Sequence, residues 1–87
     1  MQEDKRYLLV EGKNLEKNIE KSILDFVGVL GRSKAGLKLI KTGREYAIVS
    51  LNRQAVNEIR ASFSLWPEKI IVKKVSGTLK GLKKKNN

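Results

Sequence analysis

The apolar residues of this chain recur at spacings that predict two helices and four strands. Residues 5–11 have a compact apolar centre and stop at a glycine, which is typical of a buried strand. Across residues 15–30, apolar side chains return every three or four positions and form one stripe of a helix, with Asn14 as its expected N-cap. We expect Gly31 to end this helix, because glycine tolerates the left-handed conformation found just after helix ends.

The second half of the chain continues with a hairpin, a helix and a strand. Residues 37–41 and 46–51 have strand-like apolar patterns and are joined by a short turn that contains a glycine. We expect Asn52 to cap a second helix, which must end before Pro67 because the residue before a proline disfavours the helical conformation. Residues 70–75 form the last predicted strand.

This order of elements predicts an α+β fold. A chain that runs strand, helix, strand, strand, helix, strand with right-handed crossovers closes into a ferredoxin-like fold, in which a four-stranded antiparallel sheet carries both helices on one face. The 87 residues leave room for a single hydrophobic core. We therefore expect one domain over residues 1–78, followed by a lysine-rich C-terminal tail over residues 79–87.

The sheet face without helices is expected to make contacts. The first and third strands are central in this topology and apolar on both faces, so the uncovered face should bind RNA bases or another protein. We favour a protein contact, and its expected residues are Tyr7, Leu9, Tyr46 and Ile48. Base stacking on the tyrosines is less favoured, because an RNA-recognition motif has a second aromatic residue where Ile48 stands. Alternatively, the tail folds back over this face and turns helical through Leu79 and Leu82.

The charge of the chain is positive and unevenly distributed. Nineteen lysines and arginines against nine acidic residues give a net charge of +10. Residues 1–31 hold five basic and six acidic side chains, whereas residues 69–87 hold seven lysines and no acidic residue. Such asymmetry indicates a polyanionic partner, because clustered basic side chains release the counterions condensed on phosphates. A merely solubilising surface, the alternative, usually mixes both signs.

Nine basic side chains are the expected contacts to RNA phosphates. They are Arg32, Lys34, Arg53, Lys73, Lys74, Lys80, Lys83, Lys84 and Lys85. Lysine binds phosphate as a point charge and arginine as a planar fork, and such contacts position a nucleic acid without reading its sequence. Gly77 and Gly81 keep the tail pliable, so we expect it to order on binding. The alternative for the terminal lysines is a frayed, solvated end.

The residue types present argue against catalysis by this chain. Cysteine and histidine are absent, which removes thiolate chemistry, the commonest general base and the commonest metal ligand. An acylphosphatase-like site needs a glycine-rich loop with an arginine after the first strand, where this chain has Glu11-Gly12-Lys13-Asn14. We expect no catalytic residue, metal site or cofactor. The first residues lack a secretory pattern and no apolar run could span a bilayer, so we expect a cytoplasmic protein.

Four segments carry a resemblance to a known family. They are Phe26-Val27-Gly28-Val29-Leu30-Gly31, Ile48-Val49 leading into Asn52-Arg53, the stretch Val56 to Arg60, and Val75-Ser76-Gly77-Thr78-Leu79-Lys80, which is the most specific. The chain resembles the archaeal ribonuclease P protein component 2 family, which includes the Pop-type subunit of the eukaryotic enzyme. The similarity runs from about Lys5 to Lys85.

The resemblance implies a ferredoxin-like accessory subunit of a ribonucleoprotein. The holoenzyme removes the 5′ leader from precursor tRNA, and its RNA carries the Mg²⁺-dependent chemistry. The implied partners are the ribonuclease P RNA, a TIM-barrel-like protein subunit and, through the holoenzyme, precursor tRNA, with a homodimer inside a heterotetramer. Arg53 matches the family's arginine after the third strand, whereas Ser50 stands where the family has a basic residue. The alternative function is a stand-alone nucleic-acid-binding protein, either ribosomal or chromatin-associated.

Overall fold

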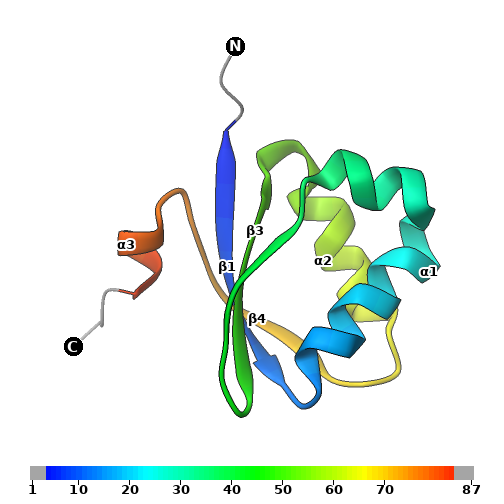
Figure 1. Cartoon of the computed structure of the whole chain (residues 1–87), viewed down its shortest axis with the longest axis horizontal. Coiled ribbons are helices and arrows are strands. Elements are labelled where there is room, and N and C mark those ends of the chain that lie inside the picture. The colour runs from blue at the N-terminus through cyan, green and yellow to red at the C-terminus, as the bar shows by residue number, and fades with distance from the viewer. Residues whose placement is uncertain (1–3, 84–87) are drawn as a thin grey trace.

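The computed structural model describes residues 4–83 and contains the predicted order of elements. The elements are β1 (Lys5–Gly12), α1 (Leu15–Ala35), β2 (Lys38–Thr42), β3 (Tyr46–Asn52), the 3₁₀ turn η1 (Arg53–Ala55), α2 (Val56–Leu65), β4 (Ile70–Ser76) and α3 (Leu79–Lys83). The strands form one sheet in the order β2-β3-β1-β4, and every neighbouring pair is antiparallel. Helices α1 and α2 lie together on one face of this sheet (Figure 1). The α+β, ferredoxin-like prediction is therefore confirmed.

The hydrophobic core lies between the sheet and these two helices. Its largest fully buried apolar side chains are Leu8, Val10, Ile23, Val49, Leu51 and Ile59. On the strands these residues are two positions apart, because alternate side chains of a strand point to the same face. Burying each such side chain contributes about 1.5–3 kcal/mol to folding, so this layer supplies most of the driving force.

The prediction that Gly31 ends the first helix was wrong. Helix α1 continues to Ala35 and ends at Gly36, whose φ of 63° is the left-handed C-cap conformation and whose N–H donates to the Ser33 carbonyl at 3.3 Å. The helix is bent at Gly28, where φ is 77° and ψ is 179°. Glycine adopts such a positive φ without the steric penalty of a Cβ atom. The glycines of this segment therefore mark a kink within the helix.

Neither predicted asparagine cap bonds through its side chain to the start of its helix. Asn14 occupies the N-cap position of α1, but it has φ 50° and ψ 41° and makes no side-chain cap hydrogen bond. Asn52 precedes η1 rather than α2. Its side chain accepts a hydrogen bond from Lys5 Nζ and donates one to the Lys34 carbonyl, both at 2.9 Å. Asn52 therefore ties β3 to β1 and to the end of α1.

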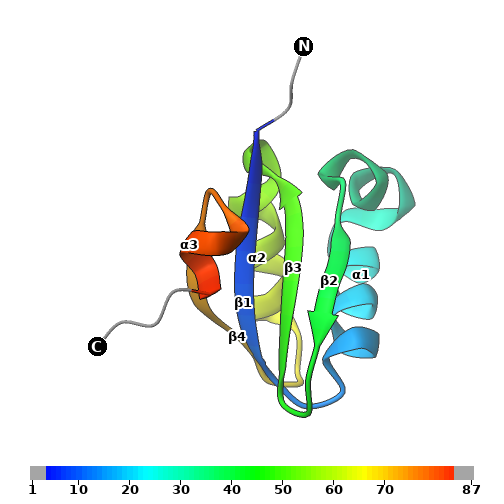
Figure 2. The ribbon, with the colours of Figure 1, turned by 60° about the vertical axis from the view of Figure 1, so that its left-hand side comes forward.

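The short helix α3 lies on the sheet face opposite α1 and α2 (Figure 2). It contacts β1 and β4, and its Leu82 is only 3% exposed. Two hydroxyl groups shape the turn before it: Ser76 Oγ accepts from the Thr78 N–H at 3.2 Å, and Thr78 Oγ1 accepts from the Gly81 N–H at 3.0 Å. The first five residues of the expected tail therefore form a helix on the sheet, as in the alternative where the tail folds back.

Candidate nucleic-acid interface

The sheet face turned away from α1 and α2, here called the open face, carries rows of side chains that run across the strands. Directly paired residues of antiparallel strands point to the same face. The first row is Tyr46, Glu11 and Ile71, the second is Lys41, Ile48, Leu9 and Lys74, and the third is Lys38, Ser50, Tyr7 and Ser76. Lysines therefore stand on the edge strands, with mostly uncharged side chains between them.

A bulge in β2 brings two lysines onto the open face. Lys38 pairs with Ser50 and Lys41 pairs with Ile48, although the two lysines are three positions apart. In a regular strand such residues point to opposite faces, but the irregularity after Leu39 adds one residue and restores the same face. Both lysines are exposed. The pair was not predicted from the sequence, because strand alternation alone assigns the two lysines to opposite faces and does not reveal a bulge.

The four residues expected to contact a protein share this open face. They are Tyr7, Leu9, Tyr46 and Ile48. Ile48 is only 5% exposed, the other three are partly buried, and α3 contacts β1 on the same side of the sheet. The face therefore offers little free apolar surface here, and the protein contact stays a prediction.

Arg32, an expected RNA contact, is engaged within the chain. Its Nε donates to Glu20 Oε2 at 2.7 Å and its Nη2 donates to Glu20 Oε1 at 3.0 Å, a bidentate ion pair across the kink of α1. The hydrogen bond to Glu20 raises the pKa of the Arg32 guanidinium above its ordinary value; partial burial opposes the rise and the Glu20 charge reinforces it. A phosphate that binds this guanidinium must compete with Glu20 for the same fork.

Two other expected RNA contacts, Arg53 and Lys34, are more accessible to a phosphate than Arg32 is. Arg53 Nε lies 3.5 Å from Asp4 Oδ2, and both side chains are more than half exposed, at 56% and 66%. Such a solvated pair is weak and can be exchanged for a phosphate contact at little cost. Lys34 is exposed near the end of α1. Three expected contacts have side chains outside the described part of the chain: Lys83, Lys84 and Lys85.

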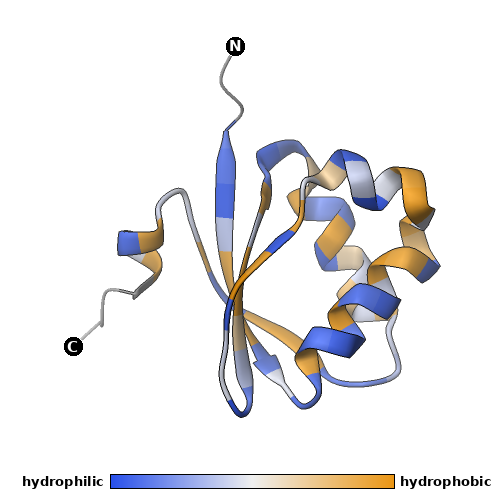
Figure 3. Ribbon diagram, in the orientation of Figure 1, coloured by the Kyte–Doolittle hydropathy of each residue, from blue (hydrophilic) through white to orange (hydrophobic). Residues whose placement is uncertain are grey.

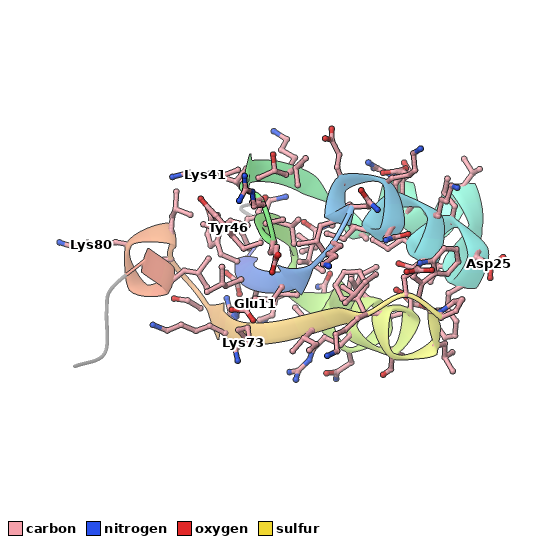
Figure 4. The ribbon with its side chains drawn as sticks, turned by 90° about the horizontal axis from the view of Figure 1, so that it is seen from below. Glu11, Asp25, Lys41, Tyr46, Lys73 and Lys80 are labelled. Atoms are coloured by element: carbon pink, nitrogen blue, oxygen red, sulfur yellow. The ribbon has the colours of Figure 1, made fainter. Side chains whose placement is uncertain are left out.

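The remaining expected contacts lie on β4 and α3. Lys73 is exposed and falls where the pairing of β4 with β1 shifts next to Leu9. Lys74 pairs with Leu9 and so points to the open face. Figure 4 shows Lys41 of β2 and Lys80 of α3 extending on the same side of the sheet. The structure therefore places Lys74 and Lys80 on the same side of the sheet as the β2 lysines, and the arginines elsewhere.

A hollow of about 670 Å³ opens at the hairpin end of the open face. It is lined by parts of β1, the β2–β3 turn, β3 and the segment from α2 to β4, with three acidic and three basic side chains among its residues. The lining residues are Glu11, Gly12, Lys13, Arg44, Glu45, Tyr46, Glu68, Lys69 and Ile71. Glu11 and Tyr46 are directly paired across β1 and β3 (Figure 4). This group was not predicted from the sequence, because its members come from separate segments whose approach depends on the sheet register.

A separate apolar surface lies at the kinked end of α1. Its members, here called the α1 patch, are Phe26, Val29 and Leu30, which are 46%, 77% and 69% exposed. Ile19 and Ile23, earlier in the same predicted stripe, are buried. Figure 3 shows this concentration of hydrophobic residues at the bend of α1. The helix bends at Gly28, so Val29 and Leu30, which follow the bend, leave the direction of the buried stripe, and the regular spacing could not predict this.

The chemistry available on the open face is binding. Lysine ammonium groups bind phosphate oxygens, and tyrosine rings stack on bases. Within residues 4–83, no group of three or more histidine, cysteine, aspartate or glutamate side chains is placed to hold a metal ion. Over the same residues, no helix has the length and hydrophobicity needed to cross a membrane.

Comparison with known proteins identifies relatives. No protein-family model matches the chain. Two similar curated proteins, from two strains of Methanococcus maripaludis, are both named ribonuclease P protein component 2. One is 32% identical over 76 residues, which cover 78% of this chain and 58% of the relative, and the other is 32% identical over 73 residues, which cover 75% and 56%. The chain thus spans somewhat more than half the length of these relatives. By this similarity, the chain belongs to the ribonuclease P protein component 2 family.

Proposed function

We propose that this chain is a non-catalytic protein subunit of ribonuclease P that supports the catalytic RNA in removing the 5′ leader from precursor tRNA. In this proposal the RNA carries the Mg²⁺-dependent chemistry, and the protein supplies phosphate contacts from its open face. The observation that carries the proposal is the pair Lys38 and Lys41, which the β2 bulge turns to one face in a chain of this family.

The placement of charge on the open face supports phosphate binding. Lys38 and Lys41 stand on the edge strand β2, Lys74 stands on the edge strand β4, and Lys80 extends from α3. An RNA backbone that crosses the sheet meets ammonium groups on both sides. Each phosphate contact displaces condensed counterions and adds about 0.7–0.9 to the salt dependence of log K. Arg32 contributes less, because its guanidinium is already paired.

We also propose that the protein partner contacts the α1 patch. The resemblance implies a TIM-barrel-like subunit as this partner. Val29 and Leu30 expose most of their surface, and the charged Arg32 follows on the same helix, so this end of α1 has the apolar centre and polar rim of a protein interface. Ile48, on the open face, has almost no free surface for such a contact. Alternatively, a second copy of this chain contacts the α1 patch within a heterotetramer.

Reconstitution with ribonuclease P RNA tests the proposal. Adding the chain together with its protein partner should lower the Mg²⁺ concentration at which the RNA removes the 5′ leader, because protein ammonium groups replace cations at the RNA phosphates. The chain alone should give no cleavage. An unchanged Mg²⁺ requirement, measured with protein that is folded and bound to its partner, contradicts the proposal.

The competing function, a stand-alone nucleic-acid-binding protein, makes a different prediction. Such a protein binds RNA or DNA without a dedicated protein subunit. Affinity capture of the tagged chain from a native extract separates the two, because the proposed subunit should retain ribonuclease P RNA and a TIM-barrel-like protein. Recovery of ribosomal RNA or chromatin in their place favours the competing function.

A further inference from the structure

We infer that the hollow at the hairpin end of the open face binds one unpaired RNA nucleotide and prefers bases that carry an exocyclic amino group. This inference rests on the proposed RNA-binding function and adds what the site reads. Its basis is the row formed by Tyr46, Glu11 and Ile71 across β3, β1 and β4. These side chains supply an aromatic surface, a hydrogen-bond acceptor and an apolar floor in one place.

Tyr46 is the stacking surface of this site. Proteins that read unpaired RNA stack the splayed base on an aromatic ring, and a hollow of about 670 Å³ has room for a nucleotide. Ile71, in the same row, is 40% exposed and extends the apolar surface. Figure 4 shows the Tyr46 side chain near Glu11 at this end of the sheet.

Lys41, beside Tyr46, is the residue that binds the phosphate of the nucleotide. Lys41 pairs with Ile48, two residues from Tyr46, so Lys41 and Tyr46 are diagonal neighbours on the open face. Such neighbours have Cα atoms about 7–8 Å apart, which leaves a lysine side chain within reach of the phosphate of a stacked nucleotide. The lining itself is of mixed charge, because Lys13, Arg44 and Lys69 stand there with Glu11, Glu45 and Glu68. The ring of Tyr46 and the exposed Lys41 beside it favour an RNA nucleotide as the occupant over a second protein surface.

Glu11 is the acceptor that selects the base. An exposed carboxylate repels phosphates, so Glu11 beside Tyr46 weakens RNA binding unless the carboxylate bonds to the base itself. An ionised carboxylate can only accept hydrogen bonds. Adenine and cytosine offer an amino group there, whereas uracil presents a carbonyl oxygen, which the carboxylate repels. The site should therefore disfavour uracil.

Binding of the whole chain to oligoadenylate, oligocytidylate and oligouridylate of equal length tests the base preference. We expect the adenine and cytosine oligomers to bind about three-fold to ten-fold more tightly than the uracil oligomer, the effect of one hydrogen bond. Glu11→Gln should bring this ratio close to one, because an amide both donates and accepts. The matched control is Glu58→Gln on α2, which changes the charge equally and should keep the ratio.

The stacking surface is tested by two substitutions of one residue. Tyr46→Leu should weaken binding of all three oligomers by at least about five-fold through lost stacking, while Tyr46→Phe should retain it. Thermal unfolding of both variants shows whether they remain folded. If Tyr46→Leu abolishes capture of the protein partner and leaves oligomer binding intact, the hollow is a protein contact and the inference is wrong.

Failure of the inference and failure of the proposed function give different results. If the chain binds ribonuclease P RNA but shows no base preference, or if Glu11→Gln leaves the preference unchanged, the nucleotide site is refuted and the subunit function stands. If the folded chain and its partner bind neither the oligomers nor ribonuclease P RNA at moderate ionic strength, the proposed function itself is wrong.

Discussion

The two faces of the sheet are built by different means. The face under α1 and α2 is closed by side chains such as Leu8, Val49 and Ile59, which are 0% exposed. The open face is covered in part by the five-residue helix α3, and its edge strand β2 remains exposed along its whole length. One face is therefore a core in which almost any polar substitution is costly, and the other is a surface that tolerates charge.

This difference explains where a binding function can reside. A core face must exclude water, so its side chains are committed to one another and cannot meet a ligand. On the open face, Lys38, Lys41 and Lys80 keep their ammonium groups in solvent while the sheet beneath fixes where they stand. Binding residues held by a rigid scaffold lose less conformational entropy when a ligand arrives. The core therefore supports binding on the open face, because it holds the strands that carry these lysines in a fixed register.

The largest expected contrast comes from truncating one isoleucine on each face. Ile59→Ala removes a side chain that is 0% exposed and should lower the free energy of unfolding by about 3 kcal/mol through lost burial and a cavity. Ile71→Ala makes the same chemical change on the open face, where the side chain is 40% exposed, and should lower it by less than about 1 kcal/mol. Urea unfolding measures both. Equal losses would show that the open face is also a core.

A smaller effect is expected where α3 closes part of the open face. Leu82 is 3% exposed, and Leu82→Ala should destabilise α3 by about 2 kcal/mol, at the low end for buried leucines because the helix is short. Hydrogen exchange should show lost protection of the Leu82 N–H, which bonds to the Thr78 carbonyl at 3.2 Å. Leu65→Ala, at a position 68% exposed, is the control and should leave α3 unchanged. Unaltered exchange in the Leu82 variant would contradict this account of α3.

The fold was predictable from the sequence because burial repeats with the period of each element. Strand alternation and the helical stripe identified the elements, and Pro67 bounded the second helix. The predicted end of α1 at Gly31 was wrong, since the two glycines of this helix region with positive φ are Gly28, which bends the helix, and Gly36, which ends it. The same glycine-rich spacing is compatible with a kink or with a stop.

The candidate site was less predictable, because it depends on register and on pairing between distant residues. The bulge that aligns Lys38 with Lys41 is a relation between β2 and β3, and periodicity within one strand does not contain it. The charge of Arg32 predicts an RNA contact, but its partner Glu20 lies twelve positions away across the kink. The sequence therefore identified the types of side chain in the candidate site, but it did not identify which residues lie next to them in the fold.

A test of the β2 bulge compares two pairs of lysines. Replacing Lys38 and Lys41 together by glutamine should reduce the salt dependence of RNA binding by roughly one unit for each lost phosphate contact. Lys17 and Lys21 are exposed on α1, on the covered side of the sheet, and their replacement by glutamine removes the same charge. That control should change the slope much less. Equal slopes for the two double variants would mean that RNA responds to net charge and not to the open face.

The smallest effect is expected at Arg32, and it decides whether this residue acts within the chain or on RNA. Arg32→Lys loses the bidentate fork to Glu20 and should lower the free energy of unfolding by about 0.5 kcal/mol, as expected for a solvated ion pair. Because the pKa of Arg32 is raised, the stabilisation persists below the ordinary arginine pKa and is lost only as pH rises through the raised value. Urea unfolding should therefore show the same small loss at neutral and mildly alkaline pH, with RNA affinity unchanged. If RNA affinity falls as far as in the Lys38 and Lys41 double variant, Arg32 is an RNA contact and the ion pair opens on binding.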